Sequence, residues 1–220
     1  MRTDLVTVIV PAYNEEKTVG EVVRVTKESP DVFEVIVVSD GSVDQTAAEA
    51  RNAGARVIEL KENLGKGQAM LKGVEGSQTQ FVVFFDADLY GLTSHHVEKL
   101  VRSVLSGRKK MNVGLRNRGR FMNLFVRHMP LISGIRAMDR AVIESIKPKY
   151  LKGFMVESAL NYACRVRGFK YGTVALHGVK IRHKYEKVWL GAAVIQYLKM
   201  GLEIAKAIIA VRLAHIKGNF

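Results

Sequence analysis

The chain has 220 residues, of which 48% are hydrophobic, so it can bury the core of one α/β domain and is not an intrinsically disordered chain. Its one cysteine, Cys164, excludes an intrachain disulfide framework and a cysteine-rich zinc site. Lysine and arginine total 34 against 21 aspartate and glutamate, and the formal net charge of +13 favours anionic partners.

Much of the positive charge lies in one block, because no acidic residue occurs between Glu98 and Asp139. A phosphorylated substrate, an acidic membrane surface or a nucleic acid would suit such a block, and a solvated basic face is the plain alternative. The block contains Lys99, Arg102, Arg108, Lys109, Lys110, Arg116, Arg118, Arg120, Arg127 and Arg136.

The N-terminus lacks the series of charged leader, apolar stretch and cleavage site that marks a signal peptide. No window of about 18 residues is both apolar and free of charge. We therefore expect a cytoplasmic protein without a membrane-spanning helix.

Apolar, β-branched runs alternate with helical periodicity over the first hundred residues. Because these runs are continuously apolar, they predict strands covered on both faces, as in a parallel sheet. Ser42 to Gln45 has the form of a capping box that opens the second helix. The order βαβαβαβ predicts an α/β fold with a mostly parallel, doubly wound sheet flanked by helices. The predicted strands are 6–10, 35–38, 56–60 and 81–85, and the predicted helices are 15–28, 46–53, 66–76 and 94–105.

This alternation stops after residue 105. Residues 106–135 are basic and punctuated by glycine, and they contain an apolar patch at Phe121, Leu124 and Phe125. A second section predicts helices over 140–146 and 157–167 and a strand over 171–176. We expect one domain over residues 1–187, in two halves (1–105 and 106–187), followed by an amphipathic helical tail over 188–220.

Polar clusters follow three of the predicted strands. The first strand ends in Pro11-Ala12-Tyr13-Asn14-Glu15-Glu16, the second in Ser39-Asp40-Gly41-Ser42, and the fourth in Asp86-Ala87-Asp88. In open α/β sheets, ligands bind beyond the carboxyl ends of the strands. These clusters therefore predict a site at one edge of the sheet.

Asp86-Ala87-Asp88 places two carboxylates on either side of a small residue, just after a buried strand. Mg²⁺ prefers oxygen ligands and commonly takes one or two carboxylates together with phosphate oxygens. Such a cation would hold a diphosphate and stabilise its charge as it leaves. The structural alternative is a pair of acidic loop caps.

Gly65-Lys66-Gly67 could approach a phosphate closely and supply a positive charge. It is not a P-loop, because Leu60 stands where that motif requires glycine, and it lacks the third glycine of the dinucleotide fingerprint. Taken alone, the segment could equally be a turn.

Together, four motifs between residues 6 and 89 resemble glycosyltransferase family 2 of the GT-A fold. They are Val8 to Glu16, Val38 to Thr46, Asn63 to Gly67 and Asp86 to Leu89. Later segments, Ser133 to Arg140 and Gly153 to Glu157, resemble the acceptor side of polyprenyl-phosphate (dolichol-phosphate) sugar transferases and of glucosyl-3-phosphoglycerate synthases.

The resemblance implies a UDP- or GDP-sugar donor bound in the half formed by residues 1–105. Asp40 would contact the base, and Lys66 would lie near the base or the diphosphate. The implied nucleotide-sugar-binding residues are Pro11, Ala12, Tyr13, Glu15, Asp40, Lys66, Gln68, Asp86 and Ala87.

The resemblance also implies Mg²⁺ or Mn²⁺, held by Asp86, Asp88 and His183. Tyr90 departs from the dolichol-phosphate branch, where a glutamine at that position helps to hold the metal. His183 matches the late histidine of the phosphoglycerate branch, although a surface histidine among basic residues is the alternative.

Three residues are candidates for catalysis: Asp88, Glu157 and Asp139. Glu157 would contact hydroxyl groups of the transferred sugar or act as general base, and a helix N-terminal acid is the alternative. Asp139 is a second candidate base. A phosphate acceptor needs no strong base, because it is already ionised.

We expect the acceptor phosphate to be bound by arginines, whose guanidinium groups match phosphate oxygens in a fork. The apolar patch beside them and the tail would contact an anionic membrane surface at the inner face of the cell membrane, and the tail could instead, or in addition, join two copies of the chain. Ordinary packing of the tail on the domain is the plain alternative. The candidate arginines are Arg116, Arg118, Arg120 and Arg136.

The sequence thus predicts metal-dependent hexosyl transfer from a nucleotide sugar to a phosphorylated acceptor, with polyprenyl phosphate preferred. A soluble transferase similar to glucosyl-3-phosphoglycerate synthase is the alternative. Nucleic-acid binding is disfavoured, because the first hundred residues show neither a basic, aromatic sheet face nor a recognition helix. A sugar nucleotidyltransferase would need a glycine-rich loop where Pro11 to Asn14 stand.

Overall fold

The computed structural model describes residues 5–116, 133–151 and 155–181, together with Lys206, Ile209, Arg212 and Leu213. Several predicted features lie outside the described residues. They are Arg118, Arg120, the apolar patch at Phe121, Leu124 and Phe125, His183, and most of the tail.

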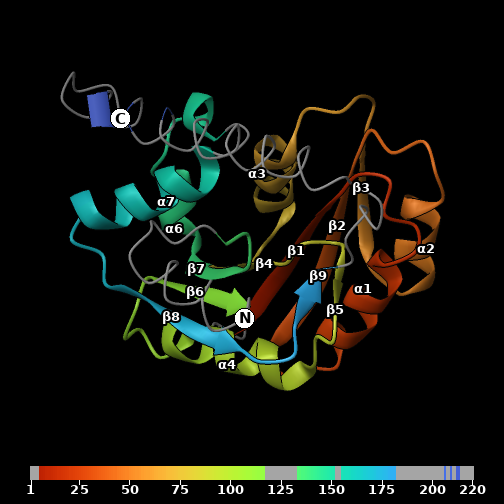
Figure 1. Ribbon diagram of the computed structural model, residues 1–220, viewed down its shortest axis with the longest axis horizontal. Coiled ribbons are helices and arrows are strands. Elements are labelled where there is room, and N and C mark those ends of the chain that lie inside the picture. The colour runs from red at the N-terminus through yellow and green to blue at the C-terminus, as the bar shows by residue number, and fades with distance from the viewer. Residues whose placement is uncertain are drawn as a thin grey trace, which may run out of the picture.

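Within the described residues, the chain forms a seven-stranded sheet in the order β3-β2-β1-β4-β7-β6-β8 (Figure 1). The sheet strands are β1 (Val6–Ala12), β2 (Val32–Asp40), β3 (Arg56–Leu60), β4 (Phe81–Phe84), β6 (Met111–Arg116), β7 (Arg136–Asp139) and β8 (Tyr171–Leu176). A separate antiparallel pair joins β5 (Leu89–Tyr90) to β9 (Lys180–Ile181).

Helices fill most of the connections between strands. They are α1 (Val19–Lys27), α2 (Thr46–Asn52), α3 (Lys66–Gly76), α4 (Ser94–Leu105), α6 (Arg140–Glu144), the 3₁₀ helix η1 (Pro148–Tyr150) and α7 (Met155–Val166). None of the helices in the described part of the chain combines the length and the apolar character needed to cross a membrane.

The sheet is mostly parallel, as the continuous apolar runs predicted. β1 pairs in parallel with β2 and β4, β2 with β3, and β6 with β8. β7 runs antiparallel to both β4 and β6, so its amino end, not its carboxyl end, lies beside the carboxyl end of β4. This reversal decides which residues of β7 can approach the site.

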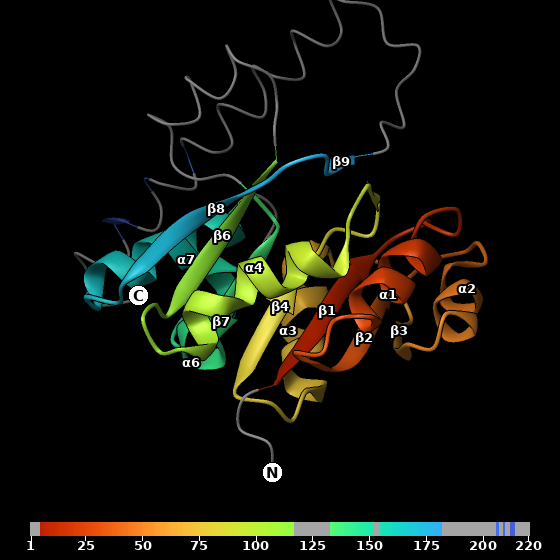
Figure 2. The ribbon, with the colours of Figure 1, turned by 90° about the horizontal axis from the view of Figure 1, so that it is seen from below.

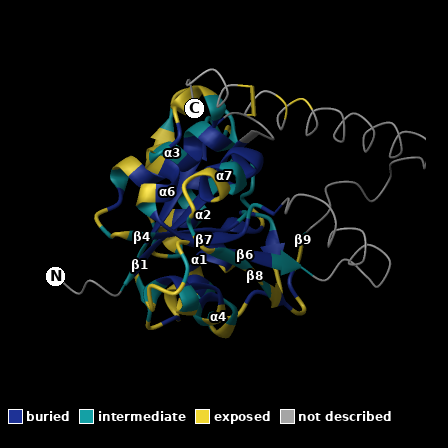
Figure 3. Ribbon diagram, turned by 90° about the vertical axis from the view of Figure 1, so that its left-hand side faces the viewer, coloured by how far each residue is buried: buried dark blue, intermediate teal, exposed yellow. Residues whose placement is uncertain are grey.

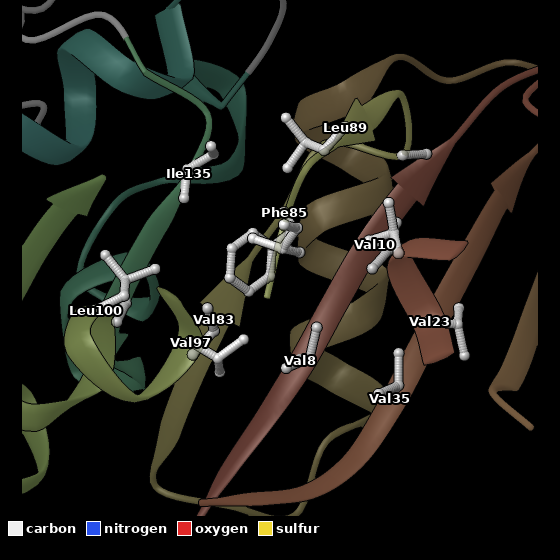
Figure 4. Packing of buried hydrophobic residues seen from close by; sticks show 14 of the residues in the cluster. Val8, Val10, Val23, Val35, Val83, Phe85, Leu89, Val97, Leu100 and Ile135 are labelled. Carbon is white, nitrogen blue, oxygen red and sulfur yellow. The ribbon is translucent and has the colours of Figure 1, made fainter. Parts of the chain in front are cut away.

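Both faces of the sheet are covered, and neighbouring residues of β1 enter different cores. Val8 and Val10 pack with α1 and α4, as Figure 4 shows, whereas Ile9 packs with α3, α6 and α7 on the other face. Figure 2 views the face covered by α1 and α4, and Figure 3 shows buried residues concentrated along the strands. The two covered faces explain why the strands lack polar alternation.

Several predicted elements match their observed bounds, and others differ for local reasons. The predicted capping box is wrong: Ser42 Oγ accepts from Asn14 N at 3.2 Å, and Asp44 Oδ1 accepts from Thr46 N at 2.9 Å. α1 begins at Val19, later than predicted, because Glu15 O accepts from the amides of Thr18 and Val19 in a turn. Strands β6 and β7 were not predicted.

Candidate active site

A pocket of about 300 Å³ lies at the carboxyl ends of β1, β2 and β4. It contains every residue predicted to bind the nucleotide sugar except Gln68, and it contains Asp88. Its lining residues are Pro11, Ala12, Tyr13, Glu15, Asp40, Asn63, Gly65, Lys66, Asp86, Ala87, Asp88 and Ile181. The structure therefore brings the three strand-end clusters and the Gly65-Lys66 segment together in space.

Asp40 holds the loop that leads into α3. Its side chain is buried, its Oδ1 accepts from Leu64 N at 2.8 Å, and its Oδ2 accepts from Gly65 N at 2.9 Å. Gly65 has a φ of 86°, a conformation that glycine adopts without strain. Asp40 therefore shapes the pocket wall, and contact with a base would use its remaining lone pairs.

The loops after β1 and β2 are joined by reciprocal hydrogen bonds. Asn14 Oδ1 accepts from Val43 N at 3.0 Å, and Glu15 N donates to Thr46 Oγ1 at 2.7 Å. Gln45 N donates to Glu16 Oε2 at 3.1 Å. These bonds fix the wall that carries Tyr13 and Glu15 without any ligand.

Asn14 is the non-glycine residue with a positive φ, 53°, in the described chain. We expect Asn14→Ala to cost about 1 kcal/mol more stability than Asn14→Gly, because alanine adopts this conformation with strain whereas both variants lose the bond to Val43. Urea unfolding of the two variants measures the difference. Equal stabilities would show that the backbone at residue 14 is not constrained.

Lys66 lies between two carboxylates from different halves of the chain. Its Nζ donates to Asp86 Oδ1 at 2.5 Å and lies 3.7 Å from Glu157 Oε1. Burial alone would lower the pKa of Lys66, but Asp86 and Glu157 outweigh it and hold that pKa above its usual value. The amino group is therefore a fixed positive charge at the pocket.

Asp88 lies in a surplus of negative charge. Burial, and after it the charges of Asp86 and Glu15, raise the pKa of Asp88 to about 6, although Arg116 acts in the opposite direction. A cation bound here would relieve this repulsion. Arg116 ends β6, whose carboxyl end lies at the same edge of the sheet as the pocket.

The pocket offers part of the set of oxygen ligands that a hard dication requires. Asp88 and Asp86 offer carboxylate oxygens, and a bound diphosphate would add phosphate oxygens. Among the described residues, no group of three or more histidine, cysteine, aspartate or glutamate side chains is arranged to hold a metal. β9 pairs with β5 directly after Asp88 and ends at Ile181, two residues before His183, which lies outside the described residues.

Tyr90, at the position of the glutamine of the dolichol-phosphate branch, is not among the lining residues of the pocket. Tyr90 is 41% exposed on β5, and Lys180 Nζ lies 5.9 Å from the centre of its ring. Ile181 was missed by the sequence analysis. Its position just before the predicted histidine ligand was the one signal that could have placed it at the site.

Asp139 is placed away from the site, so its prediction as general base needs correction. It pairs with Phe81 at the start of β4, the end opposite the pocket, because β7 is antiparallel. Its carboxylate caps α6 by accepting from Ala141 N at 3.0 Å and is paired with Lys110 at 2.7 Å. Asp139 is a structural residue.

We expect Asp139→Asn to lower the free energy of unfolding by about 1–2 kcal/mol at pH 7 and to leave activity unchanged. Burial raises the pKa of Asp139, but the hydrogen bonds from Lys110 and Ala141 outweigh it and hold the pKa below its ordinary value. The ionised group thus stabilises the fold above its unfolded pKa and loses this effect as pH falls through the lower folded pKa. Urea unfolding at pH 7 and near pH 3 should show the difference shrinking, and lost activity in a folded variant would contradict this role.

The prediction that Arg136 binds the acceptor phosphate also needs correction. Its side chain is fully buried on β7 and is not part of the pocket lining. Its Nε donates to Ser133 O, and its Nη1 donates to Asn161 Oδ1, both at 2.7 Å. An acceptor phosphate cannot reach this guanidinium in the present arrangement.

Known proteins resemble this chain in sequence and in fold. A 4,4'-diaponeurosporenoate glycosyltransferase from Staphylococcus aureus (strain MRSA252) is 37% identical over 109 residues, which cover 47% of this chain and 29% of that protein. Glycosyltransferase AglD from Haloferax volcanii is 36% identical over 122 residues, which cover 50% of this chain and 19% of that protein. The matches thus span less than a third of either relative.

Among solved structures, glucosyl-3-phosphoglycerate synthase from Mycobacterium tuberculosis, in complex with Mn²⁺, UDP-glucose and phosphoglyceric acid, has a TM-score of 0.77. It is 23% identical, and the likeness covers 94% of this chain and 79% of that chain. The same enzyme with Mg²⁺ and UDP has a TM-score of 0.74 at 24% identity, covering 96% of this chain and 78% of that chain. These likenesses establish the GT-A fold.

One family model covers most of the sheet and the pocket. The model described as glycosyl transferase family 2 matches residues 7–166, a range that includes every lining residue of the pocket except Ile181. Because this match spans well over half of the sequence, the chain belongs to glycosyl transferase family 2.

Proposed function

We propose that this chain transfers a hexosyl group from a UDP- or GDP-sugar to a phosphorylated acceptor, with a polyprenyl phosphate as the first candidate. The observation that carries the proposal is the convergence of Asp86, Asp88 and Lys66 in one pocket at the carboxyl edge of the sheet. Negative and positive charges lie side by side there, which suits a metal diphosphate bound to an organic group.

The donor would lie across this pocket, with its nucleoside against the wall formed by Pro11, Ala12 and Tyr13 and its diphosphate near Lys66. Lys66 would neutralise charge on the leaving diphosphate. Mg²⁺ or Mn²⁺, held by Asp88 and Asp86 and by His183 as a third ligand, would supply Lewis-acid stabilisation of that same charge.

The acceptor would approach from the half of the chain that carries Arg116 and Glu157. Glu157, 8% exposed in the first turn of α7, would accept hydrogen bonds from hydroxyl groups of the transferred sugar. Arg116 would hold the acceptor phosphate in line with the sugar, and Arg118 and Arg120 would extend that site. Since a phosphate is ionised at neutral pH, no general base is required, in agreement with the remote position of Asp139.

A second candidate acceptor is 3-phosphoglycerate. The fold likeness to glucosyl-3-phosphoglycerate synthase bound to phosphoglyceric acid supports it, as does the sequence resemblance around Glu157. The two candidates share a phosphate group, and they differ in the lipid chain.

A panel of UDP- and GDP-sugars, each with Mn²⁺ or Mg²⁺, tests the proposal against polyprenyl phosphate in detergent and against 3-phosphoglycerate in buffer. We expect one nucleotide sugar to give a glycosylated product with one of the acceptors, and chelation by EDTA to stop transfer. Product with the lipid supports the first candidate, and product with 3-phosphoglycerate supports the second. The absence of both transfer and nucleotide binding across the panel would refute the proposal.

A further inference from the structure

Arg136 is a fully buried arginine next to the acceptor side of the pocket. Its side chain has 0% exposure, whereas arginine is almost never fully buried unless it is paired. Burial lowers the pKa of Arg136 to about 10, and the charge of Glu157 is foremost among the influences that oppose this shift. Burial of a charged guanidinium is unfavourable, so the contacts that this group makes should explain why arginine stands here.

The guanidinium of Arg136 joins two separate segments. Its Nε donates to Ser133 O in the turn before β7, and its Nη1 donates to Asn161 Oδ1 on α7, both at 2.7 Å. The same Nη1 lies 3.5 Å from Met111 Sδ on β6. Arg136 therefore fixes the 133–135 turn relative to α7.

The 133–135 turn lies directly against the charged pair in the pocket. A Cβ atom placed on Gly134 would come within 2.5 Å of Asp86 Oδ1 and would also collide with Lys66 Nζ. Ser133 Oγ further anchors the turn by donating to Gly114 O at 2.6 Å. A shift of the turn toward the pocket would therefore press on the Lys66–Asp86 pair.

The helix α7 brings the second element to the same place. Asn161 follows Glu157 by four residues, so their side chains share one face of the helix. Glu157 Oε1 lies 3.7 Å from Lys66 Nζ. Charges thus alternate from the pocket toward the core in the order Asp86, Lys66, Glu157, Arg136.

We propose that Arg136 is a positioning residue. It holds Glu157 and the 133–135 turn in place around Lys66, so that the pocket can bind the sugar part of the donor. The inference rests on the proposed function, in which Glu157 contacts that sugar. A contribution to the stability of the fold explains the buried arginine less well, because well-packed apolar residues often replace buried charges without loss of stability. Met111, Cys164 and Tyr171 beside Arg136 offer apolar surroundings for such a replacement.

The test compares Arg136→Met with the wild type by calorimetry with UDP and with UDP-glucose in Mn²⁺, or with the guanine counterparts if the panel selects GDP. We expect the Kd of the nucleotide sugar to rise about fivefold or more, a loss of about 1 kcal/mol, while the Kd of the nucleotide changes less than twofold. The kcat of the transfer reaction should fall by a larger factor than the rise in the Kd of the nucleotide sugar. Arg140→Met, the same change on α6 at the opposite edge of the sheet, should leave both constants unchanged.

A double-mutant cycle separates positioning from a general structural effect. In a Glu157→Gln background, Arg136→Met should cost less than a further twofold in the Kd of the nucleotide sugar, because its effect passes through Glu157. Should Arg136→Met fail to fold, Asn161→Leu removes one anchor of the guanidinium and should act in the same direction, again without adding to Glu157→Gln.

Three results would overturn the inference. In Arg136→Met, the Kd values of the nucleotide and of the nucleotide sugar could rise equally, or neither Kd could change. In the cycle, Arg136→Met could raise the Kd of the nucleotide sugar by the same factor with and without Glu157→Gln. These results differ from failure of the proposed function, in which the wild type itself would bind no nucleotide or nucleotide sugar. In that case the inference falls together with the function on which it rests.

Discussion

Asp88→Asn is expected to abolish transfer while making the metal-free protein more stable above pH 6. Asparagine keeps the shape of the side chain but removes the charge that would hold the dication, so we expect kcat to fall by about 1000-fold or more. Initial rates at saturating Mn²⁺ measure this loss. Asp139→Asn, at the other edge of the sheet, is the matched control and should retain activity.

The stability gain follows from the raised pKa of Asp88, about 6 against an ordinary value of 3.8. The folded chain keeps the proton that the unfolded chain releases between these values, so ionisation of Asp88 destabilises the fold as pH rises toward 6. After allowance for solvent screening, the variant should be about 1–2 kcal/mol more stable than the wild type at pH 8 and equal to it near pH 4. An active variant, or one that is less stable at pH 8, would contradict the charge assignment.

Lys66→Met is expected to change the affinities for metal and nucleotide in opposite directions. Removing the amino group leaves Asp86 without its 2.5 Å ion pair, so Mn²⁺ alone should bind about tenfold more tightly. A nucleoside diphosphate should bind about tenfold more weakly, because its phosphates lose a positive charge. Transfer should fall by about 100-fold or more.

Electron paramagnetic resonance of free Mn²⁺ and calorimetry with UDP or GDP measure the two affinities. Lys72→Met is the matched control, because Lys72 lies on the same helix but pairs with exposed Glu75 and does not line the pocket. A variant in which both affinities weaken together would show that Lys66 supports the pocket as a whole, and that it does not compete with the metal.

The amino-terminal half was predictable because its local signals agree with the fold. β3, α3 and α4 have the predicted bounds, since apolar runs and helical periodicity coincide with a sheet covered on both faces. The strand-end clusters met at one edge because parallel strands share their carboxyl ends. β6 and β7 were not found, because short strands within a basic segment have no pattern of their own.

The sequence predicted which residues form the site, but it did not predict how their side chains contact one another. The sequence placed Asp86, Asp88 and Lys66 at one edge, but the pairing of Lys66 with Asp86 and Glu157 depends on how α3 packs against α7. The direction of β7 is set by its neighbours, so its sequence could not tell that Asp139 would face away from the pocket. Likewise, nothing local indicates that Arg136 is buried, whereas Arg116 is near enough for its charge to act on Asp88.

The most direct test of the account is the position of Mn²⁺ in crystals of the protein soaked with Mn²⁺ and UDP, or GDP if the panel selects guanine. We predict an anomalous peak at roughly 2–2.5 Å from a carboxylate oxygen of Asp88, bridged to the diphosphate, with Lys66 Nζ within reach of a phosphate oxygen. A nucleotide bound elsewhere, or in the pocket with no manganese at Asp88, would contradict the central claim.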